Sequence, residues 1–501
     1  MKKYVLLLLV SLSCLTMEAQ DRLPNVVVIL ADDIGSGDLS AYRRLHSSDS
    51  ILLETPNLDM LAADGVMFTN GHSPAALCAP SRYAVMTGQH CYRSPEPWGV
   101  WSAYSASVIR DDQPTLGRVM QSAGYQTAFM GKWHLGGRYY QEGDTTQFFE
   151  LKNTTGQKPD LFRMVDDGPL SKGFDESFTF PAGIQAAPYA IYENGNWMPI
   201  EDNSSIVPIN KAYARAKNFP LVKKAGLGDS NWDPHIMGPL LAREAESYIH
   251  LHAQDEKPFF LYYCALAVHV PHTPCDTLDG VAVKGTTPSG HMDMIKELDV
   301  QIGLMIKALK KQGIYEETVF IFTSDNGGLQ RQETIAAGHR SSDIYRGSKN
   351  LIYEGGHRVP FIVSWPGKIS GGQSDEPVLG LDVMATLADI TGVELSSPVE
   401  IDSRSLMPIL EGARKAEGHE LLMVQGGTRK TAAITEGKWK LIIQIDRKDK
   451  TWNTRKPIAL FNLEDNLQEQ ESGNMIDDPR QRKRVQAMFQ AYNEQRDGPT
   501  E

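Results

Sequence analysis

The chain has 501 residues, of which 41% are hydrophobic, and its formal net charge at pH 7 is -12. A chain of this length can bury a large core and is expected to fold as more than one structural unit. The acidic balance argues against a general nucleic-acid-binding surface, and the five cysteines are too few for a disulfide scaffold.

The start of the chain has the pattern of an export signal. Residues 1–3 carry two lysines, residues 4–10 are apolar, and residues 11–20 are small or polar. The apolar run is too short to cross a bilayer, and no later stretch approaches the roughly 20 apolar residues of a spanning helix. We therefore expect residues 1–20 to be a signal peptide, no transmembrane segment, and export to the periplasm or surface of a bacterium.

Four apolar runs are each followed by a polar cluster, as expected of buried strands that end at a ligand site. They are residues 25–30 before Asp32 and Asp33, 128–130 before Lys132 and His134, 258–263 before His269 and His272, and 319–323 before Asp325 and Asn326. In open α/β sheets ligands gather at the carboxyl ends of strands. Burying two adjacent acids at such a place costs free energy unless they bind a cation. For Asp32 and Asp33 taken alone, the alternative is a solvated turn.

The remaining pattern predicts an α/β fold with a large mixed, mostly parallel sheet flanked by helices. The expected helices cover residues 55–65, 115–120, 239–253, 292–311 and 382–391, and further strands cover 66–69 and 361–364. Residues 140–235 look irregular. Beyond residue 392 short strands and a final helix near 478–495 predict a smaller antiparallel α+β subdomain. We divide the chain after the signal peptide into residues 21–395 and 396–501.

The most specific string in the sequence begins at Cys78 and reads C-x-P-S-R-x-x-x-x-T-G through Gly88. Its proline, hydroxyl groups and Arg82 give the cysteine a polar, electropositive setting that suits chemistry. A helix that continues after Pro80 would place residue 78 at a helix N-terminus, where backbone N–H groups favour an anion.

This string resembles the modification motif of the type I sulfatases, the formylglycine-dependent sulfatases of the alkaline phosphatase superfamily, and the resemblance covers nearly all of the chain after residue 20. It implies that a formylglycine-generating, sulfatase-maturing enzyme oxidises Cys78 to formylglycine, whose hydrate is the nucleophile. Oxygen-only ligands suit Ca²⁺ or Mg²⁺, and the resemblance favours one Ca²⁺. The implied metal ligands are Asp32, Asp33, Asp325, Asn326 and residue 78.

The resemblance also implies a catalytic set made of Cys78, Arg82, Lys132, His134, His269 and Lys349. Arg82, Lys132 and Lys349 would offset negative charge on a sulfate monoester. His269 would donate a proton to the leaving alcohol, and His134 would take a proton from the second hydroxyl of the hydrate.

We expect the substrate to be a sulfated carbohydrate, such as a mucin or glycosaminoglycan fragment sulfated on galactose or N-acetylgalactosamine. Residues 88–112 form a long loop rich in aromatic and basic side chains that either stacks on a sugar ring or packs on the body. The candidate sugar contacts are Arg93, Trp98, Trp101, His272, His339 and Arg340.

Two other functions remain open from the residues alone. One is a phosphomonoesterase or phosphodiesterase of the same superfamily, and the other is a silent glycan-binding protein whose Cys78 is never converted. The spacing of Cys264 and Cys275 does not decide whether they pair.

Overall fold

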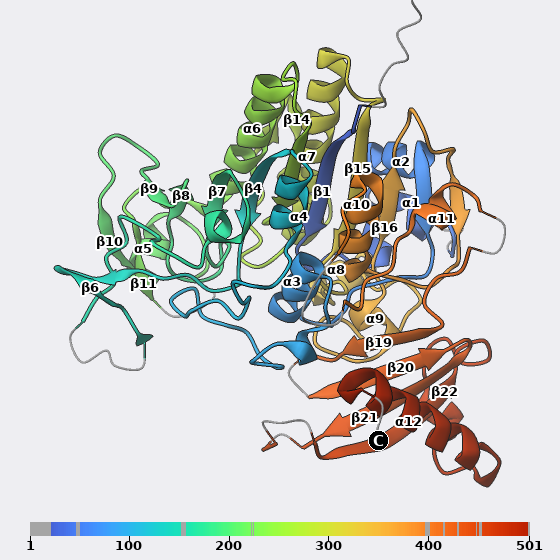
Figure 1. Ribbon diagram of the computed structural model, residues 1–501. Coiled ribbons are helices and arrows are strands. Elements are labelled where there is room, and N and C mark those ends of the chain that lie inside the picture. Colours follow the sequence, from blue (N-terminus) through green and yellow to red (C-terminus); the bar gives the residue numbers. More distant parts are fainter. Residues whose placement is uncertain are drawn as a thin grey trace, which may run out of the picture.

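Figure 1 shows the computed structural model of the chain, which describes residues 22–46, 51–151, 157–221, 223, 225–395, 401–413, 416–427, 430–446, 448–449 and 453–498. The predicted signal peptide and the first five residues of the predicted C-terminal subdomain lie outside the described residues. None of the described helices is both long and apolar enough to cross a membrane.

The core of the larger part is a mixed sheet of ten strands within the described residues. In spatial order the strands are β17 (Gly372–Ser374), β2 (Gly65–Phe68), β16 (Phe361–Ser364), β15 (Thr318–Ser324), β1 (Asn25–Ala31), β12 (Phe259–Cys264), β4 (Gln126–Lys132), β7 (Glu176–Phe180), β8 (Ile191–Glu193) and β9 (Asn196–Met198). The five central strands from β15 to β7 are parallel, and β16, β8 and β9 run antiparallel to their neighbours. The predicted fold class is confirmed.

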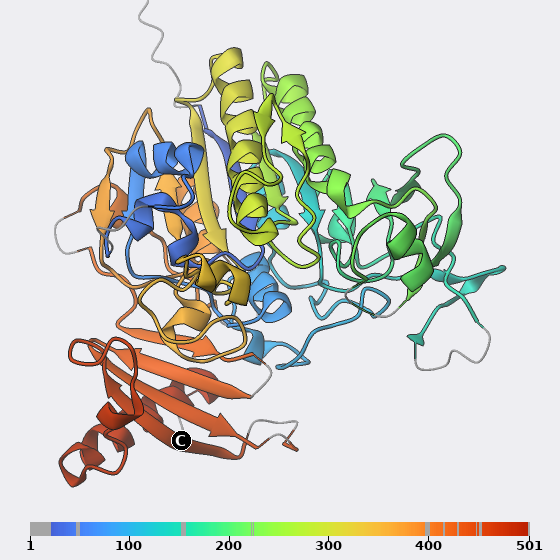
Figure 2. The same ribbon diagram turned by 180° about the vertical axis from the view of Figure 1, so that it is seen from behind.

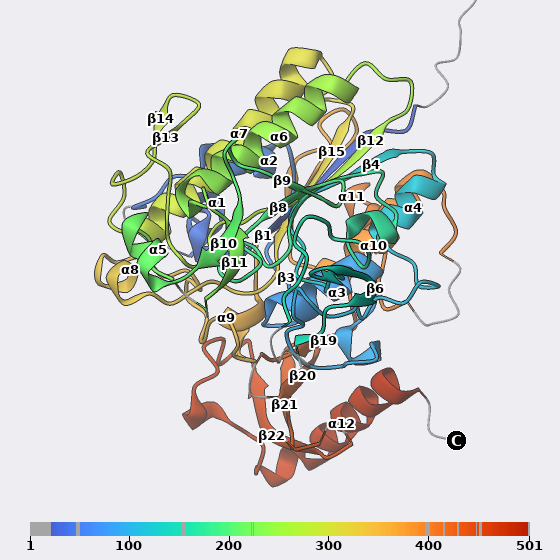
Figure 3. The same ribbon diagram turned by 90° about the vertical axis from the view of Figure 1, so that its left-hand side faces the viewer.

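Helices cover both faces of this sheet, because the central strands are apolar on both sides. In β1, Val27 and Ile29 belong to one buried cluster and Val26 and Val28 to the other. Figures 1–3 show one helical layer on each face. The first layer contains α2 (Pro56–Ala63), α6 (Pro234–His252) and α7 (Gly290–Gln312), and the second contains α3 (Cys78–Thr87), α4 (Leu116–Ser122) and α10 (Val383–Thr391).

The sequence signals that bound α7 explain its length. The Ser289 side chain accepts a hydrogen bond from the N–H of Met292 at 3.3 Å and caps the first turn. Gly313 has a φ of 73° and ends the helix in the left-handed conformation that glycine adopts readily.

The expectation that residues 140–235 are irregular is wrong, because this stretch adds β7, β8 and β9 to the central sheet. Asn194 and Gly195 both have positive φ and form the tight turn between β8 and β9. This Asn-Gly pair is a hairpin signal that the sequence contains, although the flanking strands are only three residues long. The stretch also holds β5 (Tyr140–Gln141), β6 (Asp144–Phe148), β10 (Ile206–Ile209), α5 (Lys211–Ala216) and β11 (Gly226–Asp229).

The C-terminal part is an antiparallel sheet with one long helix, as predicted, and it lies at the lower end of the body in Figure 1. It consists of β19 (Leu421–Gln425), β20 (Thr431–Glu436), β21 (Trp439–Ile445), β22 (Arg455–Asn462) and α12 (Arg482–Asp497). The remaining short elements are α1 (Ser40–Arg43), β3 (Gly71–His72), β13 (Thr277–Leu278), β14 (Val281–Ala282), α8 (Gln332–Ala336), α9 (Glu354–His357), β18 (Val378–Leu379) and α11 (Met407–Leu410).

Candidate active site

Four adjacent parallel strands bring the polar clusters of the sequence to one edge of the sheet. Strands β15, β1, β12 and β4 are neighbours in this order. Asp325 and Asn326 follow β15, Asp32 and Asp33 follow β1, and Lys132 ends β4. Segments that are up to 293 residues apart in the chain therefore meet, as in the 2.8 Å hydrogen bond from Asn326 Nδ2 to Asp33 Oδ1.

The three acids at this edge are matched by three cations, of which Arg82 and Lys132 are buried and Lys349 is partly buried. Lys132 Nζ lies 2.7 Å from Asp32 Oδ2. Lys349 Nζ pairs with Asp33 Oδ1. Arg82 donates from Nε and Nη2 to Asp325 Oδ2 at 3.0 and 2.7 Å. Arg82 Nη2 also lies 3.6 Å from Asp32 Oδ1, so the three acids and three cations form one connected network, which offsets the cost of burying their charges.

These cations lower the pKa of two of the three carboxyls. Burial alone would raise the pKa of Asp32, but Lys132, His269 and Arg82 together lower this pKa below its ordinary value. The pKa of Asp33 is also lowered against the effect of burial, mainly by Lys349. For Asp325, burial and the charge of Asp32 prevail over Arg82 and raise the pKa to about 6.

The donor set fits a hard divalent cation. Asp32 Oδ1, Asp33 Oδ2 and Asn326 Oδ1 are buried and accept no hydrogen bond from the described part of the chain. Ligand atoms of Asp32, Asp33 and His269 lie within 4.8 Å of one another. Buried oxygens normally have partners, and carboxylate and amide oxygens are the ligands that Ca²⁺ and Mg²⁺ prefer. These residues therefore fit the metal that the sequence implies.

Cys78 is the first residue of α3, as the motif predicts, and Arg82 follows one helical turn later. Arg82 also donates from Nη1 to the backbone oxygen of Lys132 at 3.1 Å, which ties α3 to the end of β4. Burial raises the pKa of the Cys78 thiol; Lys132 and Lys349 act against this rise, and Asp325 and Asp32 reinforce it. Cys78 therefore lies among the charged groups of the cluster, and its thiol is not ionised at neutral pH.

Both predicted catalytic histidines are buried and neutral at neutral pH. Burial, followed by Lys132, lowers the pKa of His134 well below its ordinary value. Burial and Lys349 lower the pKa of His269 to about 4. His269 Nδ1 lies 2.9 Å from the backbone oxygen of Val270 and must donate to it, so Nε2 carries the lone pair of the neutral ring.

Three of the predicted sugar contacts belong to segments that adjoin this site. His339 Nε2 lies 2.8 Å from Asp38 Oδ1, close behind Asp33 in the chain. His272 is partly buried and its ring is 5.0 Å from that of His291. Arg340 is exposed and lines a cavity of 710 Å³. A Cβ atom at position 37 would lie only 2.0 Å from the backbone oxygen of Arg340, so only glycine fits at Gly37.

The other three predicted contacts are held within the protein. Arg93 pairs with Asp402 at 2.7 Å, and the Asp402 N–H donates to the oxygen of Gly88, the residue that ends α3. Because α3 has ten residues, Gly88 lies about 15 Å from Cys78 along the helix axis, and Arg93 is anchored through Asp402 at that far end of the helix. Trp98 packs on the hydrophobic cluster of the C-terminal part, and Trp101 is buried beside Tyr83.

Two further residues of this region, His291 and Asp38, could not be identified from the sequence. His291 is fully buried in the first turn of α7, and neither ring nitrogen has a partner in the described part of the chain. No motif marks either residue, and only the fold brings them beside His272 and His339. Cys264 and Cys275 are both free, buried thiols, so they form no disulfide in this structure.

Comparison with known proteins agrees with this geometry. A family model described as Sulfatase matches residues 24–393, and one described as N-sulphoglucosamine sulphohydrolase, C-terminal, matches residues 346–497. The chain is 32% identical over 457 residues to an N-acetylgalactosamine-6-O-sulfatase of Bacteroides thetaiotaomicron, covering 84% of this chain and 83% of that protein. It is 31% identical over 424 residues to arylsulfatase A of Homo sapiens, covering 84% and 74%.

The fold is also that of a solved structure from work on the metabolism of multiple glycosaminoglycans by Bacteroides thetaiotaomicron. The TM-score is 0.77 at 27% identity, and the match covers 94% of this chain and 99% of that one. The family match over most of the chain and the assembled site lead to one conclusion: the chain belongs to the sulfatase family and is a sulfuric ester hydrolase.

Proposed function

We propose that this enzyme removes a sulfate ester from a sulfated sugar, with residue 78 as formylglycine and one Ca²⁺ at the cluster of acids. The observation that supports this most is the arrangement at the sheet edge. Three acids and three cations pair around Cys78 and still leave three buried oxygens that accept no hydrogen bond from the described residues.

The proposed ligands of the Ca²⁺ are Asp32, Asp33, Asp325, Asn326 and residue 78. When bound, the ion offsets the negative charge of the sulfate group and favours the ionised form of a coordinated hydroxyl. The unmodified Cys78 thiol would be a weak nucleophile here, because its raised pKa leaves it protonated at neutral pH. As formylglycine, the residue supplies a hydrated aldehyde with a hydroxyl nucleophile.

The side chains of the site then have distinct tasks. Lys132 and Lys349 keep Asp32 and Asp33 ionised and provide positive charge where a sulfate group meets residue 78. Arg82 holds Asp325 and the end of β4 in place relative to the first turn of α3. The lowered pKa of His134 keeps its ring neutral, so it has a lone pair that can accept a proton from the hydrate of residue 78.

His269 is the proposed proton donor to the leaving alcohol. Its Nδ1–H is held by the oxygen of Val270, so donation from Nε2 requires the imidazolium form. The approach of a sulfate monoester brings negative charge toward the ring and favours that form.

The proposed substrate is a sugar of the galactose or N-acetylgalactosamine type, because the relative with 32% identity is named for sulfate release from N-acetylgalactosamine. His272, His339 and Arg340 are the proposed sugar contacts. Export to the periplasm or surface of a bacterium, after removal of residues 1–20, belongs to the same proposal and gives the enzyme access to extracellular glycans.

A panel of monosulfated mono- and disaccharides that differ only in sulfate position and sugar epimer tests this proposal. We expect one sulfate position on one sugar type to dominate kcat/KM, because a site that reads hydroxyls leaves polar groups unpaired with the wrong isomer. Equal kcat/KM across the panel would refute the sugar assignment. Faster turnover of nitrophenyl phosphate than of every sulfate ester would favour the phosphoesterase alternative.

A further inference from the structure

A second buried charge cluster joins the C-terminal sheet to the catalytic part. The Lys440 side chain, on β21, is fully buried. Its Nζ lies 2.8 Å from Glu354 Oε1, 2.9 Å from Glu469 Oε1 and 3.0 Å from His357 Nε2. Arg358 binds the other oxygen of Glu354 at 2.7 Å. Two acids thus balance two cations in a water-poor setting.

The chemistry of these groups fixes the direction of a hydrogen-bond chain. An ammonium group only donates, so His357 Nε2 accepts from Lys440. His357 is neutral because burial and Lys440 lower its pKa to about 3. Its proton is therefore on Nδ1 and is donated to His72 Nδ1 at 2.8 Å. His72, also neutral, then donates from Nε2 to Asn70 Oδ1 at 2.8 Å.

This cluster is a hydrogen-bonded network and not a metal site. His72, Glu354 and His357 place ligand atoms within 4.8 Å of one another. However, both oxygens of Glu354 are bound to cations, and the two histidine Nδ1 atoms are bound to each other. A metal ion would have to displace these contacts beside Lys440 and Arg358.

The network lies between the two segments that carry Cys78 and Lys349. The N–H of Ser73 donates to the oxygen of His357 at 2.8 Å, and the N–H of Asn350 donates to the oxygen of Ala76 at 2.7 Å. On the other side, Ala76 and Gln425 of β19 are joined by a backbone hydrogen bond of 2.8 Å. The C-terminal sheet therefore contacts the chain two residues before Cys78.

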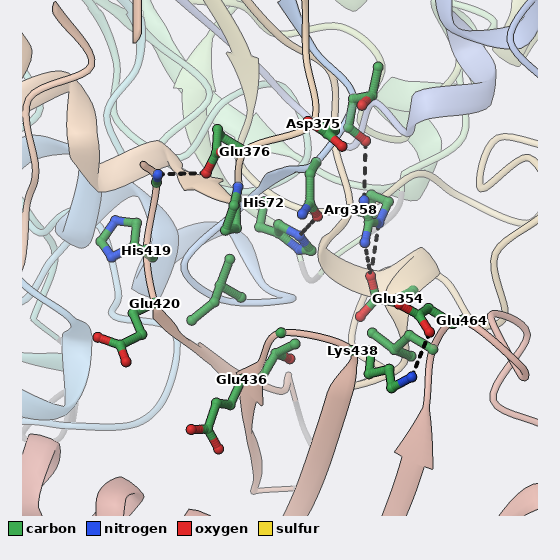
Figure 4. A pocket seen from close by; sticks show the side chains of 18 of the residues that line it. His72, Glu354, Arg358, Asp375, Glu376, His419, Glu420, Glu436, Lys438 and Glu464 are labelled. Atoms are coloured by element: carbon green, nitrogen blue, oxygen red, sulfur yellow. Dashed lines mark hydrogen bonds and ion pairs between the residues drawn. The ribbon is translucent and has the colours of Figure 1, made fainter. Parts of the chain in front are cut away.

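Solvent reaches one side of this network. His72, Glu354 and Arg358 line a cavity of 770 Å³ between the catalytic part and the C-terminal sheet, and Figure 4 shows Arg358 directed at Glu354 on its wall. Protons can therefore exchange with the histidine pair without passing through the active site.

We propose that Lys440 is a positioning residue for the catalytic centre. Through Glu354 and His357 it holds the segment that follows Lys349 against the segment that leads to Cys78. The C-terminal sheet thereby sets the position of the nucleophile relative to a catalytic cation. The predicted effect of Lys440 on the reaction rate rests on the proposed function. Its predicted effect on the structure does not.

The test compares K440M with K438M, a matched variant in the turn before β21, where the exposed Lys438 side chain pairs with Glu464. With the preferred sugar of the panel as substrate, K440M should lower kcat by about tenfold to a hundredfold, because small displacements of reacting groups are costly. KM should change by less than about threefold, since the sugar contacts lie on other segments. K438M should match the wild type in both.

The pH dependence of kcat separates positioning from general damage. Without Lys440, His357 faces Glu354 and Glu469 with only Arg358 to oppose them, and its pKa rises. Protonated His357 would gain an N–H on Nε2, on the side of Glu354, and would restore a positive charge where Lys440 is missing, while its Nδ1–H still donates to His72. K440M should therefore recover part of its lost kcat as the pH falls, a pH dependence that the wild type and K438M lack. K440R, which keeps a charged donor, should restore part of kcat without this pH dependence.

Hydrogen exchange followed by mass spectrometry gives a readout that does not depend on activity. Residues 73–78 and 349–357 should exchange faster in K440M than in K438M, while α7 stays protected in both. If K440M fails to fold, the same comparison is made with E469Q, which removes one negative charge from the cluster but leaves a side chain of similar size. Unchanged exchange in these segments, or equal kcat in K440M and K438M, would overturn the inference. A wild-type enzyme that releases no sulfate would refute the proposed function. The exchange data would still decide whether Lys440 holds these two segments in place.

Discussion

Arg82 donates two hydrogen bonds to a single carboxylate oxygen of Asp325, at 3.0 and 2.7 Å, across 243 residues of sequence. This pair fixes the first turn of α3 against the end of β15. It thereby places residue 78, one turn earlier on the same helix, beside the acids at the sheet edge.

The first prediction concerns this pair. R82K keeps the charge but loses the planar two-donor geometry, so it should lower kcat and reduce the free energy of unfolding by about 1–3 kcal/mol. Urea denaturation measures the stability change. R480K is the matched control, because Arg480 binds Asp478 through the same two kinds of nitrogen on the surface. We expect no measurable change there. Equal effects of R82K and R480K would contradict the role of Arg82.

The second prediction concerns the metal. Ca²⁺ at a hundredfold excess over its Kd should stabilise the wild type by about 2.7 kcal/mol, provided that the unfolded chain does not bind it. D33N removes one ligand and leaves Lys349 without its acid, so most of the Ca²⁺-dependent rise in Tm should disappear together with activity. Calorimetric titration of Ca²⁺ checks the binding directly. D478N, on the surface, should keep the full rise. Full activity after thorough removal of metal would show that the cluster has another task.

The third prediction concerns pH and stability. Glu297 is buried in α7, and burial raises its pKa to about 7 from an ordinary value of 4.5. Between these two values the folded state binds more protons than the unfolded state. This group therefore makes stability fall as the pH rises from about 4.5 to 7, by about 3 kcal/mol in all, with no further change above that.

E297Q should remove this contribution. Its free energy of unfolding, measured by urea denaturation at several pH values, should fall less steeply than that of the wild type between pH 5 and 7. The difference between the two curves isolates Glu297, whatever the absolute stability of the variant. Parallel curves would show that Glu297 does not titrate in this range.

Much of the site could be predicted from the sequence because its parts are local. Apolar runs mark the acids after β1 and β15 and Lys132 at the end of β4, and the Cys78 string is itself a recognisable motif. Parallel strands necessarily bring their carboxyl ends together. The pairing of particular acids with particular cations could not be predicted, because it depends on side chains from segments that are up to 316 residues apart.

The surroundings of the site were less predictable. Arg93 and Trp98 have the residue types of a sugar-binding loop, but their contacts with Asp402 and the C-terminal cluster depend on how the two parts pack. His291 carries no local signal at all. The strands of residues 176–198 were missed because they are short, and only the turn at Asn194 and Gly195 marks them.

The nucleophile is the subject of the fourth prediction and of the central claim. Peptide mass spectrometry should show that, in its natural host, residue 78 has exchanged sulfur and two hydrogens for one oxygen. C78A should keep the fold, because the core hardly depends on this small side chain, and circular dichroism and Tm check this. The variant should release no sulfate above background.

The most direct test combines both measurements in one set of preparations. Coexpression with different amounts of a sulfatase-maturing enzyme yields protein with different fractions of converted residue 78, and sulfate release is measured from the preferred sugar for each. We predict a rate proportional to the converted fraction, with a line through the origin. Full activity in protein that contains only unmodified Cys78 would contradict it.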